Sequence, residues 1–227
     1  MTAYETLRYE QHGPVGVLTL DRARCLNAIN FVMRDELHAW LDERARDLDT
    51  RVLVVTGAGR AFSAGLDIKD PTITGGAYSP RQAYVAQRTF SEMILKLRRL
   101  PQPIIGAIHG PAMGAGFSIA MACDIRLATA EAVFQAAYIN LGFGGADMGS
   151  SWLLTRAVGA GNAARYLLSG DKLPAADVGC GDIGHQVTDH LFADPHVLAN
   201  QLDQLGFGVG TLVRRGRRRL RWGRLRL

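Results

Sequence analysis

The first indication of the fold is the stretch Arg60-Ala61-Phe62-Ser63-Ala64-Gly65-Leu66-Asp67-Ile68-Lys69. It directly follows Arg51–Thr56, an apolar and β-branched run that is typical of a strand buried on both faces. Gly65 permits a close approach of the backbone, and we expect a helix to open after it, with Asp67 as its cap. Free N–H groups at a helix start favour an anion or a developing oxyanion. Taken alone, the stretch also fits an ordinary strand-to-helix turn.

A second stretch repeats this arrangement: His109-Gly110-Pro111-Ala112-Met113-Gly114-Ala115-Gly116-Phe117-Ser118. It follows the buried run Pro103–Ile108 and leads into an apolar helical segment. One G-x-G pattern is weak evidence for a binding site. Two units of strand, glycine turn and helix, roughly fifty residues apart, could direct two backbone N–H groups at one point.

The remaining sequence predicts an α/β fold built from stacked β-β-α units. Asp70–Pro80 is polar and rich in turn residues, which is typical of a mobile surface loop. Further strands are expected at Thr6–Gln11, Val15–Asp21 and Asp124–Ala128. Helices are expected at Asn30–Leu48 with Asn30 as the cap, Arg81–Leu100, Gly114–Cys123, Met148–Val158 and Asn162–Ser169.

Three segments together resemble the signatures of the crotonase (enoyl-CoA hydratase/isomerase) family. Phe62–Ile68 is similar to the motif F-x-A-G-x-D followed by an apolar residue. Gly110–Gly116, continued by Ala122–Arg126, is similar to the second signature. Asp21–Asn30 resembles the segment N-R-P-x-x-x-N-A-L, with Ala23 in place of the proline. Order and spacing agree over roughly Leu7–Leu173, so the resemblance covers most of the chain.

The resemblance implies a crotonase-like spiral of β-β-α units followed by a helical C-terminal region. It also implies an enzyme that binds an acyl-CoA thioester and stabilises its enolate, with the backbone N–H groups of Leu66 and Ala115 as the oxyanion hole. Coenzyme A enters as part of the substrate, so no separate cofactor and no metal are expected. By the same resemblance the substrate contacts Arg22, Arg24, Leu26, Ala64, Gly65, Asp67, Ile68, Lys69, Gly114, Ser118 and Tyr138.

The acid–base residues depart from the family pattern. Typical hydratases carry two glutamates, and the matching positions here are Ser118 and Tyr138. Asp147 is the carboxylate that remains nearby, in a segment that resembles the A-D-x-G stretch of dienoyl-CoA isomerase-like members. Asp147 is interpreted either as the catalytic acid or base, or as the cap of the helix Met148–Val158. An apolar acyl pocket, or simply core, is expected at Phe134, Tyr138, Phe143, Met148 and Trp152.

Composition indicates an ordinary globular protein, with 48% hydrophobic and 21% charged residues. Three widely spaced cysteines and a start without a signal-peptide pattern favour a cytoplasmic location. Ile104–Cys123 is uncharged, but His109-Gly110-Pro111 argues against a membrane span. His185, His190 and His196 are irregularly spaced and do not indicate a metal site.

The C-terminal part has an unusual composition. Eight arginines lie between positions 214 and 226, and subtracting their charge from the net charge of +5 leaves −3 for the rest. We expect a core at 1–175, a remnant of the helical region at 176–205 and a disordered arginine-rich tail at 206–227. By resemblance the protein would form a trimer or hexamer, which this altered end puts in doubt.

Three functions stay open from the sequence. The first is an acyl-CoA hydratase or isomerase that uses Asp147. The second is an acyl-CoA-binding relic, suggested by the missing glutamates. The third is binding of nucleic acid or an anionic membrane by the arginine tail, which lacks any recognised module and is not favoured.

Overall fold

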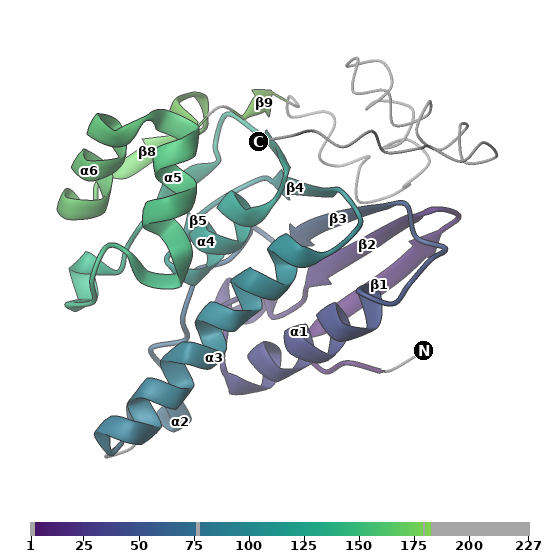
Figure 1. Ribbon diagram of the computed structural model, residues 1–227, viewed down its shortest axis with the longest axis horizontal. Coiled ribbons are helices and arrows are strands. Elements are labelled where there is room, and N and C mark those ends of the chain that lie inside the picture. Colours follow the sequence, from purple (N-terminus) through teal and green to yellow (C-terminus); the bar gives the residue numbers. More distant parts are fainter. Residues whose placement is uncertain (1–2, 76–77, 179, 183–227) are drawn as a thin grey trace, which may run out of the picture.

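The computed structural model describes residues 3–75, 78–178 and 180–182. Its centre is a six-stranded sheet in the order β1-β2-β3-β4-β6-β9 (Figure 1). β1 runs antiparallel to β2, and each later pair of neighbours is parallel. The strands are β1 (Leu7–His12), β2 (Val15–Leu20), β3 (Val52–Gly57), β4 (Ile104–Ile108), β6 (Ile125–Ala128) and β9 (Gly181–Asp182).

A smaller, three-stranded sheet has the order β5-β7-β8. β5 (Ala112–Met113) pairs in parallel with β7 (Val133–Gln135), which pairs antiparallel with β8 (Lys172–Pro174). Residues 109–111 connect β4 to β5, and Gly114 connects β5 to helix α4 (Ala115–Ala122). The start of α4 therefore directly follows a strand of the small sheet.

The main helices pack on one face of the large sheet. α1 (Phe31–Arg44) and α3 (Pro80–Arg99) lie side by side there (Figure 1), and α4 contacts α3. Their apolar side chains share one buried cluster with those of the strands, and Trp40, Phe62, Phe117 and Phe134 are among its largest fully buried members. The shorter elements are η1 (Ala23–Cys25), α2 (Pro71–Thr74), η2 (Ile139–Leu141), η3 (Asp147–Gly149), α5 (Ser150–Val158), α6 (Ala160–Ser169) and η4 (Ala175–Val178).

The predicted α/β fold with β-β-α units is confirmed, and most predicted elements agree within one or two residues. Asn30 caps α1 as expected, because its Oδ1 accepts a hydrogen bond from Met33 N at 3.0 Å. The helix ends at Arg44 rather than Leu48, and Leu48 is 85% exposed. The predicted helix Met148–Val158 begins at Ser150 instead, because Met148 has a φ of +47°.

The prediction of a helix directly after Gly65 is wrong. Ile68 and Lys69 form a turn, and the loop expected from Asp70 onward contains the short helix α2, which is capped by the Asp70 side chain. Asp67 therefore caps no helix.

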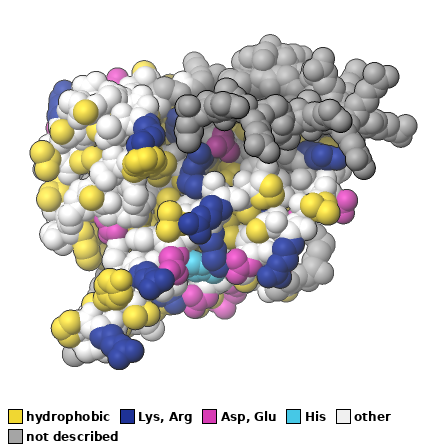
Figure 2. All heavy atoms as spheres, in the orientation of Figure 1, with side chains coloured by type: hydrophobic (Ala, Val, Ile, Leu, Met, Phe, Trp, Pro, Cys, Tyr) yellow, Lys and Arg dark blue, Asp and Glu magenta, His cyan; other side chains and the backbone are white. Residues whose placement is uncertain are grey.

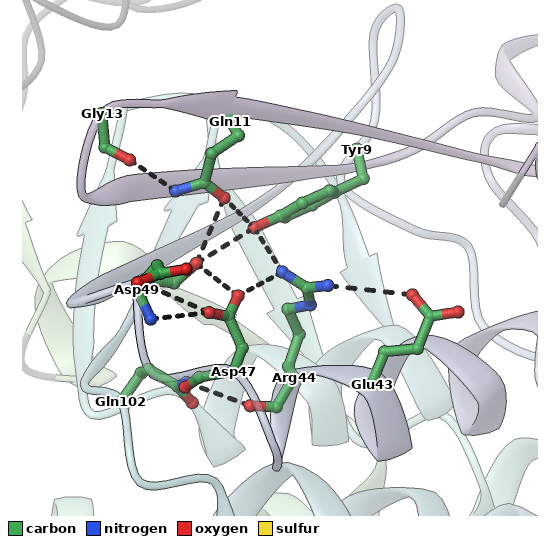
Figure 3. Close-up of polar contacts among 9 residues, drawn as sticks. Tyr9, Gln11, Gly13, Glu43, Arg44, Asp47, Asp49 and Gln102 are labelled. Atoms are coloured by element: carbon green, nitrogen blue, oxygen red, sulfur yellow. Dashed lines mark hydrogen bonds and ion pairs between the residues drawn. The ribbon is translucent and has the colours of Figure 1, made fainter. Parts of the chain in front are cut away.

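A polar cluster explains why α1 ends early (Figure 3). The Arg44 guanidinium donates to Tyr9 Oη at 3.0 Å and pairs with Asp47, while its centre lies 4.6 Å from the centre of the Tyr9 ring. Asp47 accepts hydrogen bonds from the Thr50 hydroxyl at 2.6 Å and from the Thr50 and Asp49 N–H groups. Gln102 Nε2 donates to the carbonyls of Arg44 and Asp47. The cluster ties the hairpin β1–β2, the end of α1 and the start of β4 together.

On the face shown in Figure 2, charged side chains of both signs gather over α1 and α3. α5 and α6 expose apolar residues, among them Trp152 at 62% and Leu168 at 75%. No helix in the described part of the chain is long and apolar enough to cross a membrane. The remnant predicted at 176–205 is described only as far as β9, and the arginine-rich tail lies outside the described residues.

Candidate functional site

The two glycine turns that the sequence singles out lie against each other. A methyl group added to Gly65 would lie 2.5 Å from Met113 O and 3.2 Å from Ala115 N. Ser63 joins the turns by a parallel bridge to Ala112, in which Ser63 N donates to Pro111 O and Met113 N donates to Ser63 O. Gly65 has a φ of +88° and Gly114 a φ of +50°, backbone conformations that favour glycine. This contact brings the two predicted units together.

The N–H of Leu66 points away from the strand-like segment beside it. Ile29 N donates to Gly65 O at 2.7 Å, and Asp67 N donates to Ile29 O at 3.0 Å. Leu66 lies between these two bonds, and successive groups of an extended backbone point to opposite sides. Its own N–H therefore faces away from Ile29, and no described residue accepts a hydrogen bond from it.

The N–H of Ala115 is also unpaired among the described residues. Ala115 is the first residue of α4, and the first N–H groups of an α-helix have no intrahelical acceptor. The helix start adds a partial positive charge to this donor. Two N–H groups from different units thus lie at one place without acceptors in the described structure.

A cavity of about 910 Å³ opens at this place. Of the predicted site residues, Arg22, Arg24, Leu26, Ala64, Leu66, Asp67, Ile68, Lys69, Gly114, Ala115, Tyr138 and Asp147 line it. Gly65 and Ser118 do not, because Gly65 packs behind the turn and Ser118 is fully buried in α4. Of the residues expected in an apolar pocket or in the core, Tyr138, Phe143 and Met148 line the cavity, Phe134 is buried core and Trp152 is exposed on α5.

An ion pair anchors the first turn. Arg22 Nη1 lies 2.8 Å from Asp67 Oδ2 and also donates to Ala28 O. Both side chains are largely buried, at 19% and 9% exposure. Lys69 N donates to Asp67 Oδ1 at 3.2 Å. Asp67 therefore fixes the backbone just after Leu66.

Asp147 lines the same cavity from η3. Its Oδ1 accepts hydrogen bonds from Met148 N at 2.7 Å and from the Gln87 side chain of α3. No described residue donates to its Oδ2. Burial raises the pKa of Asp147, and the two hydrogen bonds offset part of that rise. The predicted role as cap of α5 is wrong, because the N-cap is Gly149 and the Asp147 side chain accepts no hydrogen bond from that helix; only the Asp147 carbonyl contacts its first residue, Ser150.

Ser118 and Tyr138, at the positions where the resemblance would place glutamates, bond to each other. Their hydroxyl oxygens are 2.5 Å apart, and Tyr138 Oη donates to Gly114 O at 2.7 Å. Burial raises the pKa of Tyr138; the Ser118 hydrogen bond offsets part of that rise, and the negative charge of Asp147 adds to it.

Sequence reasoning missed several residues that line the cavity. Gln87 and Phe90 come from α3, and their place relative to Asp147 depends on how α3 packs, which no local pattern reveals. Arg60 adds a cation beside Arg24 and Lys69, and all three are exposed without an ion pair to a described residue. No group of three or more potential metal ligands occurs in the described part of the chain.

The family described as enoyl-CoA hydratase/isomerase matches residues 10–194. A probable enoyl-CoA hydratase of Mycobacterium leprae is 38% identical over 185 residues, which are 79% of this chain but 63% of that relative. The 1,2-epoxyphenylacetyl-CoA isomerase of Escherichia coli is 36% identical over 201 residues, covering 87% and 76%. The solved structure of enoyl-CoA hydratase from Bacillus anthracis superimposes with a TM-score of 0.75 at 25% identity, covering 91% of this chain and 77% of that one. The fold expected from the resemblance is thereby confirmed.

Proposed function

The chain belongs to the enoyl-CoA hydratase/isomerase family, and on this premise we propose that it binds an acyl-CoA thioester and holds the thioester oxygen with two backbone N–H groups. The observation that carries the proposal is the placement at one cavity of the N–H groups of Leu66 and Ala115, which have no acceptor among residues 3–75, 78–178 and 180–182. They belong to turns that touch at Gly65.

The chemistry of an enolate fits these donors. Removal of a proton next to a thioester carbonyl places negative charge on the carbonyl oxygen. Preset N–H groups stabilise that charge without reorganising, and each contributes a factor of roughly 10²–10³ to the rate. The donors are backbone atoms, so the side chains of Leu66 and Ala115 need only leave the oxygen accessible.

The rest of the cavity suits the two ends of an acyl-CoA. Arg24, Arg60 and Lys69 make no ion pair with a described residue and offer cations for the phosphates of coenzyme A. Apolar side chains would contact the acyl group at the other end, namely Phe90, Leu141, Phe143 and Met148. Arg22 is engaged with Asp67, so its role is to fix the first turn.

Asp147 supports isomerisation rather than hydration. Activation of water by two glutamates is not available, because Ser118 and Tyr138 carry no carboxylate and bond to each other. A single carboxylate can remove a proton from one carbon of the acyl chain and return it to another, which leaves the enolate charge on the held oxygen in between. Asp147 Oδ2 accepts no hydrogen bond from the described part of the chain and can take this role, while Gln87 and Met148 orient the other oxygen.

The test is turnover of short- and long-chain enoyl-CoA thioesters, followed by mass spectrometry in deuterated water. Hydration adds the mass of a water molecule to the thioester, whereas isomerisation does not. Isomerisation introduces deuterium only to the extent that the Asp147 carboxyl exchanges its proton with the solvent before returning it. Asp147→Asn should lower kcat by roughly 10²–10⁴, whereas Asp171→Asn, an exposed carboxylate outside this cavity, should not. Unchanged turnover in Asp147→Asn would overturn the role of Asp147. Addition of water would overturn the preference for isomerisation.

A second candidate is an acyl-CoA-binding protein without turnover. The bonded pair Ser118 and Tyr138 favours it, since both usual carboxylates are replaced. Calorimetric binding of the thioesters, with no product formed even after long incubation at high protein concentration, would select this function. Assembly into a trimer or hexamer remains an expectation from family membership, and light scattering after size-exclusion chromatography tests it.

A further inference from the structure

A buried hydrogen-bond chain ends at the peptide group that supplies one of the two N–H donors. Ser118 is fully buried and Tyr138 is 6% exposed. The carbonyl of Gly114 accepts two hydrogen bonds, one from Tyr138 Oη at 2.7 Å and one from Ser118 N at 3.0 Å. Because the tyrosine proton is donated to Gly114 O, the Ser118 hydroxyl donates its own proton to Tyr138 Oη.

The carbonyl of Gly114 and the N–H of Ala115 belong to the same peptide group. A peptide group is planar and trans, so its C=O and N–H point in opposite directions. A bond that fixes the direction of the oxygen therefore fixes the direction of the N–H. Hydrogen bonds to the oxygen also polarise the group, which strengthens the N–H as a donor.

Gly114 itself offers little to fix this plane. It has a φ of +50°, carries no side chain and makes no side-chain cap for α4. Glycine is the most permissive residue in the backbone, so hydrogen bonds to its carbonyl must select one orientation. Ser118 N supplies one of these bonds from within α4, and Tyr138, at the start of η2, supplies the second and shorter one.

Other roles for the pair fit the contacts less well. Ser118 does not line the cavity, and its hydroxyl is used by Tyr138, so it cannot attack a substrate in this arrangement. The Tyr138 proton is donated to Gly114 O and is therefore engaged within the protein. Burial also raises its pKa, which disfavours release of that proton.

We propose that Tyr138, supported by Ser118, is a positioning residue that directs the Ala115 N–H at the thioester oxygen. A hydroxyl pair thus occupies the two positions of the usual carboxylates and acts through the backbone. This inference rests on the proposed function, because only a bound thioester supplies the oxygen that the Ala115 N–H would hold.

The test compares two ligands of the full-length protein. One is an acyl-CoA thioester, and the other is the matching S-alkyl-CoA thioether, which lacks the carbonyl oxygen. Tyr138→Phe should reduce the preference for the thioester by about 2- to 12-fold, the worth of one neutral hydrogen bond. Affinity for the thioether should not change, because the ring that lines the cavity remains.

Two further variants guard against misinterpretation. Ser118→Ala combined with Tyr138→Phe leaves no buried hydroxyl unpaired, and it should show the same loss if Tyr138→Phe folds poorly. Tyr166→Phe is the matched control, because Tyr166 is 8% exposed and donates to Asp177 at 2.9 Å outside this cavity. It should keep the full preference for the thioester.

The amide resonance of Ala115 gives a readout that needs no ligand. Its proton shift should change in Tyr138→Phe and stay constant in Tyr166→Phe. An unchanged Ala115 resonance, together with an unchanged thioester preference, would overturn this inference and leave the proposed function intact. Equal affinity of the wild-type protein for both ligands would instead overturn the proposed function, and this inference with it.

Discussion

Replacement of Gly65 by alanine should separate the two turns and disable the N–H pair. The new methyl group would lie 2.5 Å from Met113 O, and carbon–oxygen contacts under 3.0 Å are essentially not found. The Met113–Ala115 turn must therefore move by about 0.5 Å, which is the tolerance within which catalytic groups must be held. We expect kcat/KM to fall by roughly 10²–10³, as after loss of one oxyanion donor.

A matched variant isolates this effect from backbone strain. Gly65 and Gly13 both have positive φ, at +88° and +55°, and alanine at such a φ costs about 1–2 kcal/mol. A methyl group on Gly13 meets nothing within 4 Å, and Gly13 lies in the β1–β2 turn outside the cavity. Gly13→Ala should therefore lower the stability but leave kcat/KM unchanged.

The assay is steady-state kinetics on a converted thioester, with thermal unfolding measured on the same samples. If the wild-type protein only binds, the preference for thioester over thioether replaces kcat/KM. A folded Gly65→Ala variant that retains activity within about threefold of wild type would refute the reasoning, since a displaced donor cannot be silent.

Three further predictions test other contacts. If ionised Asp147 is the base, kcat/KM should fall as the pH drops through the pKa of Asp147. Burial raises that pKa, so the fall should lie above the value of about 3.9 of an ordinary aspartate. If the same fall persists in Asp147→Asn, another group causes it. Burial alone would raise the pKa of Asp47, but hydrogen bonds from Thr50 and Asp49 and the charge of Arg44 lower it overall. Ionised Asp47 therefore stabilises the fold above its unfolded pKa of about 3.9, and this stabilisation is lost as the pH falls through the lower pKa of the folded state. Asp47→Asn should lower the free energy of unfolding in urea by about 1.5–3 kcal/mol at pH 7. An equal loss in strong acid would contradict this reasoning. Arg22→Met should cost about 3–5 kcal/mol because it leaves Asp67 buried without its partner, and adding Asp67→Asn should recover part of that loss; a purely additive double variant would show that the pair does not interact.

The elements were predictable where a local pattern decides them. The apolar runs that became β3 and β4 and the Asn30 cap of α1 depend on neighbours in sequence, and they were found within one or two residues. The end of α1 was not, because the Arg44–Asp47 cluster draws on Tyr9 and Gln102, which are distant in sequence.

In the candidate site, too, the features set by local sequence were predictable and those set by distant residues were not. The turns around Gly65 and Gly114 follow from the sequence, because positive φ and close approach both require glycine. The role of Asp67 was misjudged, since its partner Arg22 lies 45 positions away. The bond between Ser118 and Tyr138 joins α4 to η2 and is visible only in three dimensions.

The most direct measurement of the central claim is the infrared stretch of an isotopically labelled thioester carbonyl bound to the full-length protein. Two N–H donors from Leu66 and Ala115 should shift this stretch to lower frequency than in water, and Gly65→Ala should return it towards the aqueous value. A bound carbonyl that absorbs at or above its frequency in water, in the wild-type protein, would show that the two turns do not hold the oxygen.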